Sequence, residues 1–297
     1  MHTCSAEIED MISGLHHSIH QRYKWIIRIL KYASLKNDNV KSVIAGMEKE
    51  RQAFSTWLLY ELKKRPEHCS YIRDITLKHN SIYKLLHDLV YSISKNKAKN
   101  KSFDEVYNAM RAFTEAISDY HRHLEQLRSC YDTLTGLPMR KLFNERVIRE
   151  TNKKRRNIYL LILDVDHFKN INDSYGHMIG DKVLIHIAKS LRKITRNDEM
   201  LCRFGGEEFI VILYADSNED AYSAGKRLTK CIELETFLID SIKIKITVTS
   251  GLTKLYPDED ITSALERADA GLYNGKRSGR NRCIFITRGE YQNIITK

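Results

Sequence analysis

The chain has 297 residues, of which 42% are hydrophobic, and a formal net charge of +11 at pH 7. This length is enough for two domains that each bury a core of their own. No apolar run approaches the length of a membrane span and the acid-bearing N-terminus lacks the pattern of a signal peptide, so we expect a soluble, cytoplasmic protein without a membrane partner. The cysteines lie far apart, which argues against a disulfide framework and a cysteine-only zinc site.

The positive charge favours polyanionic partners, and nucleic acid is one candidate. The most basic runs are Lys95 to Lys101 and Lys153 to Arg156. No aromatic residue is interspersed in either run to stack on bases. We therefore interpret both runs as solvated connectors, and we expect no nucleic acid partner.

Residues 1–128 show a helical pattern almost throughout. Apolar residues recur at three- and four-residue spacing from Ile8 to Leu30 and again from Phe103 to Leu127. Pro66 separates the second helix from the third. Four helices with short connections predict an antiparallel four-helix bundle, whose last helix leads into the second domain.

The pattern changes in residues 129–297. Ile158 to Val165 is a near-continuous apolar run, as expected of a central strand that is covered on both faces. Helices are predicted over Gly180 to Arg196 and over Glu219 to Leu234, and Ile242 to Val248 alternates as a strand. The fold class predicted for the whole chain is therefore α plus α/β, a helical bundle followed by a palm-like mixed sheet flanked by helices.

The second domain also contains the turn Arg203 to Phe209, in which two glycines precede two glutamates. A Gly-Gly pair supplies the positive φ that a tight β-hairpin turn demands. Adjacent carboxylates repel each other, and a hard divalent cation would neutralise them. Asp164 ends the apolar strand, where ligands collect in open α/β sheets, and a neighbouring hairpin would bring Glu207 and Glu208 to the same metals. From the turn alone, a solvated acidic loop is the alternative.

With this turn, a series of spaced motifs makes residues 132–282 resemble the GGEEF-domain diguanylate cyclases. The motifs are Asp132 to Pro138, Asp164 to Lys169, Asn172-Asp173, Gly176-His177, Gly180-Asp181 and Lys276 to Arg282. The resemblance implies that two GTP molecules condense into cyclic di-GMP with release of pyrophosphate, a signalling reaction linked to biofilms. A catalytically inactive domain that acts as a receptor for GTP or cyclic di-GMP is the alternative, but such domains typically lose the acids retained here.

The resemblance also implies roles for single residues. Asp164, the Val165 carbonyl and Glu207 resemble the Mg²⁺ ligands of the family, in which two metal ions serve each active site. Either Glu207 or Glu208 deprotonates the attacking 3′-hydroxyl. The residues that resemble substrate contacts are Asn172 and Asp181 for guanine, and Phe168, Lys169, Lys276 and Arg280 for the triphosphate. His177 fits the substrate-binding pattern, or it merely caps or packs.

Two further expectations concern assembly and feedback. Each catalytic domain holds one GTP, whereas the product joins two nucleotides symmetrically, so catalysis should require a homodimer. Many members of the family carry Arg-x-x-Asp before the GGEEF turn, where cyclic di-GMP binds and inhibits. Here the spacing gives Arg196 and Glu199, whose acid is longer by one methylene. We therefore expect a degenerate inhibitory site.

More weakly, the helical domain resembles the chemoreceptor zinc-binding domain, and the whole chain is similar to zinc-regulated diguanylate cyclases. This implies a sensory and dimerising role. By spacing, the positions of the family's zinc ligands, three histidines and a cysteine, hold Arg22, Gln52, His79 and Tyr83. Only His79 remains, as a vestigial zinc site, so zinc is not expected as a cofactor. Other histidines could rebuild a site, although we favour their interpretation as surface residues: His16, His20, His87, His121 and His123.

Overall fold

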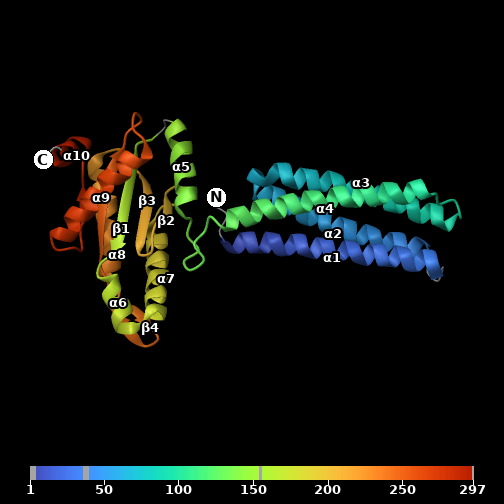
Figure 1. Ribbon diagram of the computed structural model, residues 1–297, viewed down its shortest axis with the longest axis horizontal. Coiled ribbons are helices and arrows are strands. Elements are labelled where there is room, and N and C mark those ends of the chain that lie inside the picture. The colour runs from blue at the N-terminus through green and yellow to red at the C-terminus, as the bar shows by residue number, and fades with distance from the viewer. Residues whose placement is uncertain (1–4, 36–39, 154–155, 296–297) are drawn as a thin grey trace. The chain divides into compact units, whose positions relative to one another are not determined.

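The computed structural model describes residues 5–35, 40–153 and 156–295. The chain divides into two compact units, Met1–Arg128 and Ser129–Lys297. The first unit is helical and the second is a mixed sheet flanked by helices, which confirms the predicted fold class (Figure 1). None of the described helices combines the length and the apolar composition that a bilayer span requires.

Long helices pack side by side in the first unit (Figure 1). They are α1 (Ser5–Leu35), α2 (Val40–Lys64), α3 (Cys69–Ser94) and α4 (Asn100–Arg128). Helix α1 contacts α2 and α4, and α3 contacts the same two helices. The apolar stripes meet inside the unit, where Ile8, Leu15 and Leu124 are each 0% exposed. Between α2 and α3, a short 3₁₀ turn begins at Pro66, a residue that lacks the N–H needed to continue a helix.

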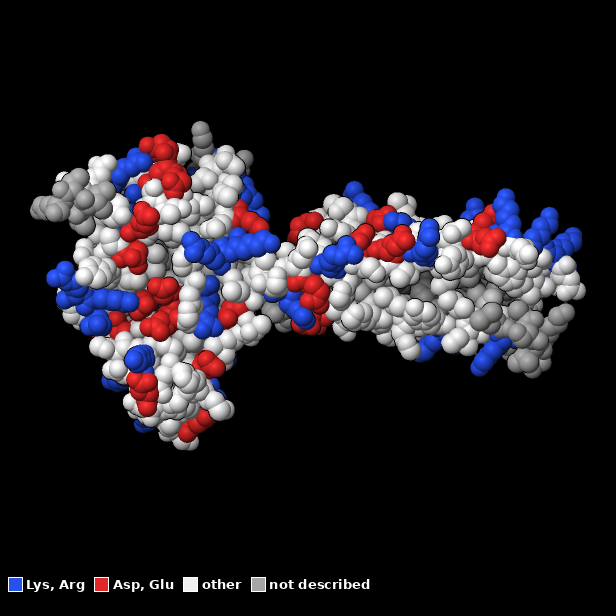
Figure 2. All heavy atoms as spheres, in the orientation of Figure 1, with Lys and Arg blue, Asp and Glu red and all other residues white. Residues whose placement is uncertain are grey.

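The exposed connection between α3 and α4 carries most of the basic run Lys95 to Lys101, whose last lysine belongs to α4. Figure 2 shows Lys and Arg side chains at this end of the helical unit, while both signs of charge are interspersed elsewhere on the visible face. The second basic run, Lys153 to Arg156, is described only at its two ends, which are exposed. The described residues of both runs are therefore exposed, as expected of solvated segments, but Arg156 also forms an ion pair with Asp198.

The second unit is organised around one sheet with the strand order β2-β3-β1-β6-β7. Strand β1 is central and pairs antiparallel with β3 and β6, whereas β6 and β7 are parallel. The strands are β1 (Ile158–Val165), β2 (Met200–Arg203), β3 (Glu208–Tyr214), β6 (Val248–Leu255) and β7 (Cys283–Phe285). Helices that accompany them are α5 (Arg140–Lys153), α6 (Phe168–Tyr175), α7 (His177–Ile194), α8 (Asn218–Leu234), α9 (Ile261–Arg277) and α10 (Arg288–Ile295).

Two hydrophobic clusters cover the two faces of this sheet. Leu161 and Leu163 of β1 pack in a cluster with residues of α7 and α8. Leu160 and Ile162, which alternate with them, pack in a cluster with residues of α5 and α9. Every residue of β1 is therefore buried, which explains its continuous apolar run.

The prediction of one strand over Ile242 to Val248 is wrong, because this segment is divided between two strands. The segment Ile242 to Val248 contains β5 (Ile242–Ile244), which pairs with β4 (Phe237–Ile239) in a small separate hairpin. The central sheet then takes up a different strand, β6, beginning at Val248. Alternating apolar residues mark extended backbone, but they do not report a change of partner strand within the run.

Candidate active site

Asp164 lies near the carboxyl end of β1 and is 6% exposed. Its Cα partners are Glu208 on β3 and Thr249 on β6. Because directly opposed residues of antiparallel strands project from the same face, Asp164 and Glu208 share one face of the sheet. The Lys276 Nζ atom lies 2.9 Å from Asp164 Oδ1. Burial nevertheless raises the pKa of Asp164, and Lys276 offsets this only partly.

The predicted hairpin forms, and strand β3 of the hairpin pairs with β1 as expected. Its glycines act differently from the prediction, because neither Gly205 nor Gly206 has a positive φ. A Cβ atom on Gly205 would lie 2.6 Å from Glu208 Oε2, so this glycine leaves room for the carboxylate. The expected positive φ was wrong because Phe204 to Glu207 form a longer connection than a two-residue turn.

Asp132 and Arg203 hold the hairpin in place, a role that the sequence analysis missed. Arg203 donates to the Gly206 carbonyl at 2.6 Å and to Asp132 Oδ2 at 2.9 Å. Asp132 also accepts hydrogen bonds from the backbone and hydroxyl of Thr135. Burial would raise the pKa of Asp132, but these hydrogen bonds outweigh burial and lower it. The Asp-x-x-Thr spacing is the sequence signal for such a turn.

Glu207 and Glu208 complete the acidic group beside Asp164. Burial raises the pKa of both glutamates, and the charge of Asp164 raises both further. In the described part of the chain, no three acidic, histidine or cysteine side chains are grouped closely enough to hold a metal ion by themselves. The hard oxygen atoms of the acids nevertheless suit Mg²⁺, which keeps several water ligands and needs few from the protein.

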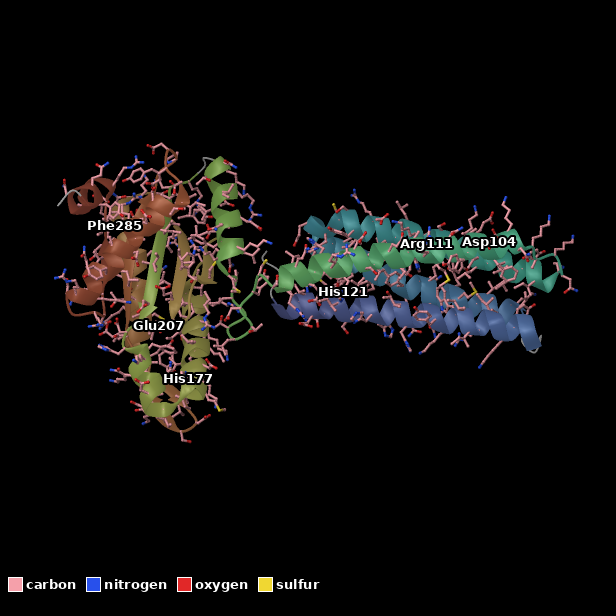
Figure 3. All side chains as sticks on the ribbon, in the orientation of Figure 1. Asp104, Arg111, His121, His177, Glu207 and Phe285 are labelled. Atoms are coloured by element: carbon pink, nitrogen blue, oxygen red, sulfur yellow. The ribbon has the colours of Figure 1, made fainter. Side chains whose placement is uncertain are left out.

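Asn172 on α6 and Asp181 on α7 occupy the adjoining helix pair. The Asn172 Oδ1 atom is buried, and no described residue donates a hydrogen bond to it. A Cβ atom on Gly180 would lie 1.9 Å from the same oxygen, so only glycine fits there. Asp181 is exposed, as is His177 at the start of α7. Figure 3 shows His177 at this helix end and Glu207 at the edge of the sheet.

The predicted triphosphate contacts come from two segments. Phe168 is buried and Lys169 exposed at the start of α6, directly after His167, whose φ is 56°. Lys276 belongs to the last turn of α9, and Arg280 follows in a loop with φ of 61°. Both segments lie near the carboxyl end of β1, because α6 follows β1 in the chain and Lys276 pairs with Asp164.

The two residues of the expected inhibitory site are oriented differently. Glu199 is 6% exposed and its carboxylate accepts a hydrogen bond from the Arg196 backbone at 2.8 Å. Burial raises the pKa of Glu199. The Arg196 side chain is exposed and, with Arg156 and Arg227, lines a pocket of about 510 Å³. The glutamate therefore stabilises its own turn, whereas the arginine faces outward.

In the helical unit, Gln52 and Tyr83, two of the positions compared with zinc ligands, belong to an ionic cluster with Glu48 and Arg51. Arg51 and Gln52 donate to Glu48 at 2.6 and 3.0 Å, and the Arg51 guanidinium lies 4.9 Å from the Tyr83 ring centre. Hydrogen bonds from Arg51 and Tyr83 lower the pKa of Glu48 to about 2.

His79 is fully buried near this cluster, with its ring 4.9 Å from that of Phe54. The Arg22 side chain lies outside the described part of the structure. Apart from Arg22, the residues at the compared positions offer one imidazole and no cysteine, which does not fit a tetrahedral zinc site.

Comparisons with known proteins agree with the geometry at the end of β1. The sequence profile described as "Diguanylate cyclase, GGDEF domain" matches residues 129–282. Diguanylate cyclase DgcZ of Escherichia coli K12 is 32% identical over 294 residues, which cover 99% of this chain and 98% of that protein. Diguanylate cyclase A of Treponema denticola is 41% identical over 136 residues, which cover 46% of this chain and 37% of that protein.

Solved structures give the same result. The coiled coil and GGDEF domain of Caulobacter crescentus DgcB, in complex with c-di-GMP, has a TM-score of 0.55 at 30% identity and covers 61% of this chain and 99% of that one. Diguanylate cyclase SiaD of Pseudomonas aeruginosa, solved with its activator SiaC, has a TM-score of 0.51 at 26% identity. The match covers 83% of this chain and 96% of that one. The chain therefore belongs to the GGDEF-domain family of diguanylate cyclases.

Proposed function

We propose that this cyclase condenses two GTP molecules into cyclic di-GMP, with release of two pyrophosphates, at the carboxyl end of β1. The observation that carries the proposal is the register that places Asp164 opposite Glu208, with Glu207 next to it. A domain that only received nucleotides would not need these three neighbouring acids, of which Asp164 is buried and both glutamates are half-buried. The receptor alternative is therefore not favoured.

Asp164, the Val165 carbonyl and Glu207 would hold Mg²⁺, and Glu207 or Glu208 would accept the proton of the attacking 3′-hydroxyl. A general base works best when its pKa approaches the working pH, and burial raises the pKa of both glutamates in that direction. Two bound Mg²⁺ ions would stabilise the charge on the attacking and leaving oxygens. Lys276 occupies the position of a counter-charge to Asp164 and would turn to the triphosphate on binding.

Guanine recognition would fall to Asn172 and Asp181, with His177 beside them. The Asn172 Oδ1 atom lacks a donor among the described residues, and the N–H groups of guanine can supply one. Lys169, Lys276 and Arg280 would bind the triphosphate, assisted by backbone N–H groups near His167 and Phe168. Because GTP is a cytoplasmic nucleotide, we expect the reaction to take place in the cytoplasm.

Two such sites must face each other, because each phosphodiester of the product joins nucleotides from different active sites. We propose that residues 1–128 act as a sensory and dimerising domain that keeps two cyclase domains, residues 129–297, at high local concentration. Sedimentation should therefore give a dimer. A monomer with full activity at high dilution would contradict this part of the proposal.

The activity is tested by incubating the protein with GTP and Mg²⁺ and separating the products by chromatography. We expect cyclic di-GMP and pyrophosphate from the wild type and no detectable product from Glu207→Gln. Glu145→Gln serves as the matched control, because Glu145 is an exposed residue of α5 outside the site. GTP binding without product formation by the wild type would instead support the receptor alternative.

A further inference from the structure

Asp166 lies two residues after Asp164 but has different surroundings. It is 5% exposed, and its Oδ1 atom accepts a hydrogen bond from Thr249 Oγ1 at 2.6 Å. Its Oδ2 atom accepts from Thr247 Oγ1 at 2.7 Å and from the Asn281 backbone N–H at 3.1 Å. One carboxylate thus connects the end of β1, the start of β6 and the loop after α9.

The loop that Asp166 holds has an unfavourable backbone. Arg280 and Asn281 have φ of 61° and 49°, so two successive non-glycine residues adopt the left-handed conformation. Such a conformation persists only where neighbouring groups enforce it. The Arg280 N–H donates to the Gly275 carbonyl at 3.0 Å, and the Asn281 N–H donates to both Asp166 and Thr249 Oγ1.

Thr249 adds a packing contact to the same arrangement. A Cβ atom on Gly275 would lie 2.6 Å from the Thr249 methyl group, so the threonine packs directly against the backbone of α9. Gly275 immediately precedes Lys276, and it also supplies the carbonyl that holds Arg280. Asp166 and Thr249 therefore contact both ends of the segment 275–281. This segment carries Lys276 and Arg280, the two cations proposed to bind the triphosphate.

We propose that Asp166, together with Thr247 and Thr249, is a positioning residue that fixes the loop of residues 278–282 so that Arg280 meets the triphosphate of GTP. This inference rests on the proposed function of Arg280. Asp166 itself does not contact substrate, because the hydroxyls of Thr247 and Thr249 and the Asn281 N–H already occupy its carboxylate oxygens.

Asp166→Asn tests the proposal, because asparagine keeps the shape but replaces one acceptor oxygen by an amide that donates. We expect KM for GTP to rise by roughly tenfold, as for the loss of a buried charge-assisted hydrogen bond, while kcat falls much less. Thr249→Val keeps the packing on Gly275 but removes the hydroxyl, so it should change KM in the same direction by less. Thr236→Val, at an exposed position between α8 and β4, is the matched control.

A double-mutant cycle distinguishes positioning from a general loss of stability. If Asp166 acts through Arg280, Asp166→Asn should have almost no effect on GTP affinity when Arg280→Ala is already present. Hydrogen exchange of the Asn281 amide should also quicken in Asp166→Asn and not in Thr236→Val. Additive effects of the two substitutions, or unchanged exchange, would overturn the proposal even if the wild type makes cyclic di-GMP. A wild type without product would instead overturn the proposed function.

Discussion

The two units contain acidic groups of opposite character. At the end of β1, burial raises the pKa of Asp164, Glu207 and Glu208, the charge of Asp164 raises that of both glutamates further, and Lys276 is a partial counter-charge. In the helical unit, the adjacent Arg51 and Tyr83 lower the pKa of Glu48 to about 2. The acids at the end of β1 therefore carry negative charge that Lys276 does not fully balance, whereas Glu48 is already balanced by Arg51.

This difference indicates which of the two units a metal ion would stabilise. A divalent cation added to the acids at the end of β1 would relieve repulsion that the fold leaves unbalanced. A cation added beside Glu48 would have to displace Arg51, which donates two hydrogen bonds to that carboxylate. We therefore expect the catalytic unit to depend on metal and the helical unit to be indifferent to it.

The largest effect should come from Asp164→Ala. Removing this carboxylate deprives the site of a proposed metal ligand and leaves Lys276 without its partner. We expect the rate of cyclic di-GMP formation to fall by at least about 10²-fold, the usual scale for loss of an electrostatic catalytic group. Glu145→Ala, at an exposed position of α5 in the same domain, is a suitable control for folding. A rate close to that of the wild type would remove Asp164 from the site.

Substitution of Asn172 should change selectivity more than turnover. Asn172→Ala removes the oxygen that lacks a donor in this structure, so discrimination between GTP and ATP should fall by about tenfold or more. Competition kinetics with both nucleotides measure this ratio directly. An unchanged ratio in Asn172→Ala and in Asp181→Ala would show that guanine is read elsewhere.

The pH dependence of metal binding has a definite sign. A carboxyl group with a raised pKa stays protonated to a higher pH, and the protonated form does not bind Mg²⁺ well. The rise in Tm on adding Mg²⁺ should therefore be largest near neutral pH. On acidification, this rise should disappear at a pH that is still higher than the ordinary pKa of a carboxyl group. Without metal, the same groups favour folding when protonated, so their contribution to stability falls as pH rises. A double variant with Asp164→Asn and Glu207→Gln should weaken both dependences and leave only the contribution of Glu208.

Product inhibition should be weak, because Glu199 is directed into its own turn while Arg196 faces solvent. Calorimetric titration with cyclic di-GMP should show weak binding that Arg196→Ala changes by less than about twofold. Arg149→Ala on α5 provides an exposed arginine for comparison. Tight binding that only Arg196→Ala abolishes would mean that the longer acid is harmless.

The smallest effect concerns the cluster in the helical unit. Arg51→Ala leaves Glu48 without its cation, and the two side chains are 31% and 32% exposed. We expect a loss of only about 1 kcal/mol, because solvent screens a pair of this exposure. Thermal unfolding followed at helical wavelengths measures the change. Arg111→Ala on α4, whose nearest acid is 3.7 Å away, should leave the transition unchanged (Figure 3).

Local patterns were enough to predict much of this structure. The apolar run Ile158 to Val165 identified the central strand because both of its faces are buried. The spacing of acids and glycines identified the hairpin and the end of β1, and those residues do meet. Helix α8 begins as predicted, with the Ser217 hydroxyl accepting from the Asp220 N–H.

Contacts between distant segments could not be predicted from local patterns. Asp166 binds Asn281, which is 115 residues away, and nothing in either segment indicates the partner. The orientation of Glu199 depends on the burial of its own side chain against the domain, which spacing does not report. The two glycines of the hairpin were assigned a positive φ, but close approach of Glu208 accounts for Gly205. Register and side-chain direction thus required the fold itself.

The cyclase rate at a fixed excess of Mg²⁺, measured while free zinc is varied from submicromolar to micromolar levels, tests the contrast between the two units most directly. We expect full dependence on Mg²⁺ and a change of less than about twofold across the zinc range, because Gln52, His79 and Tyr83 supply one imidazole and no cysteine at the compared positions. A steep loss of activity at stoichiometric zinc, reversed by a zinc-selective chelator and absent in His79→Ala, would contradict this expectation.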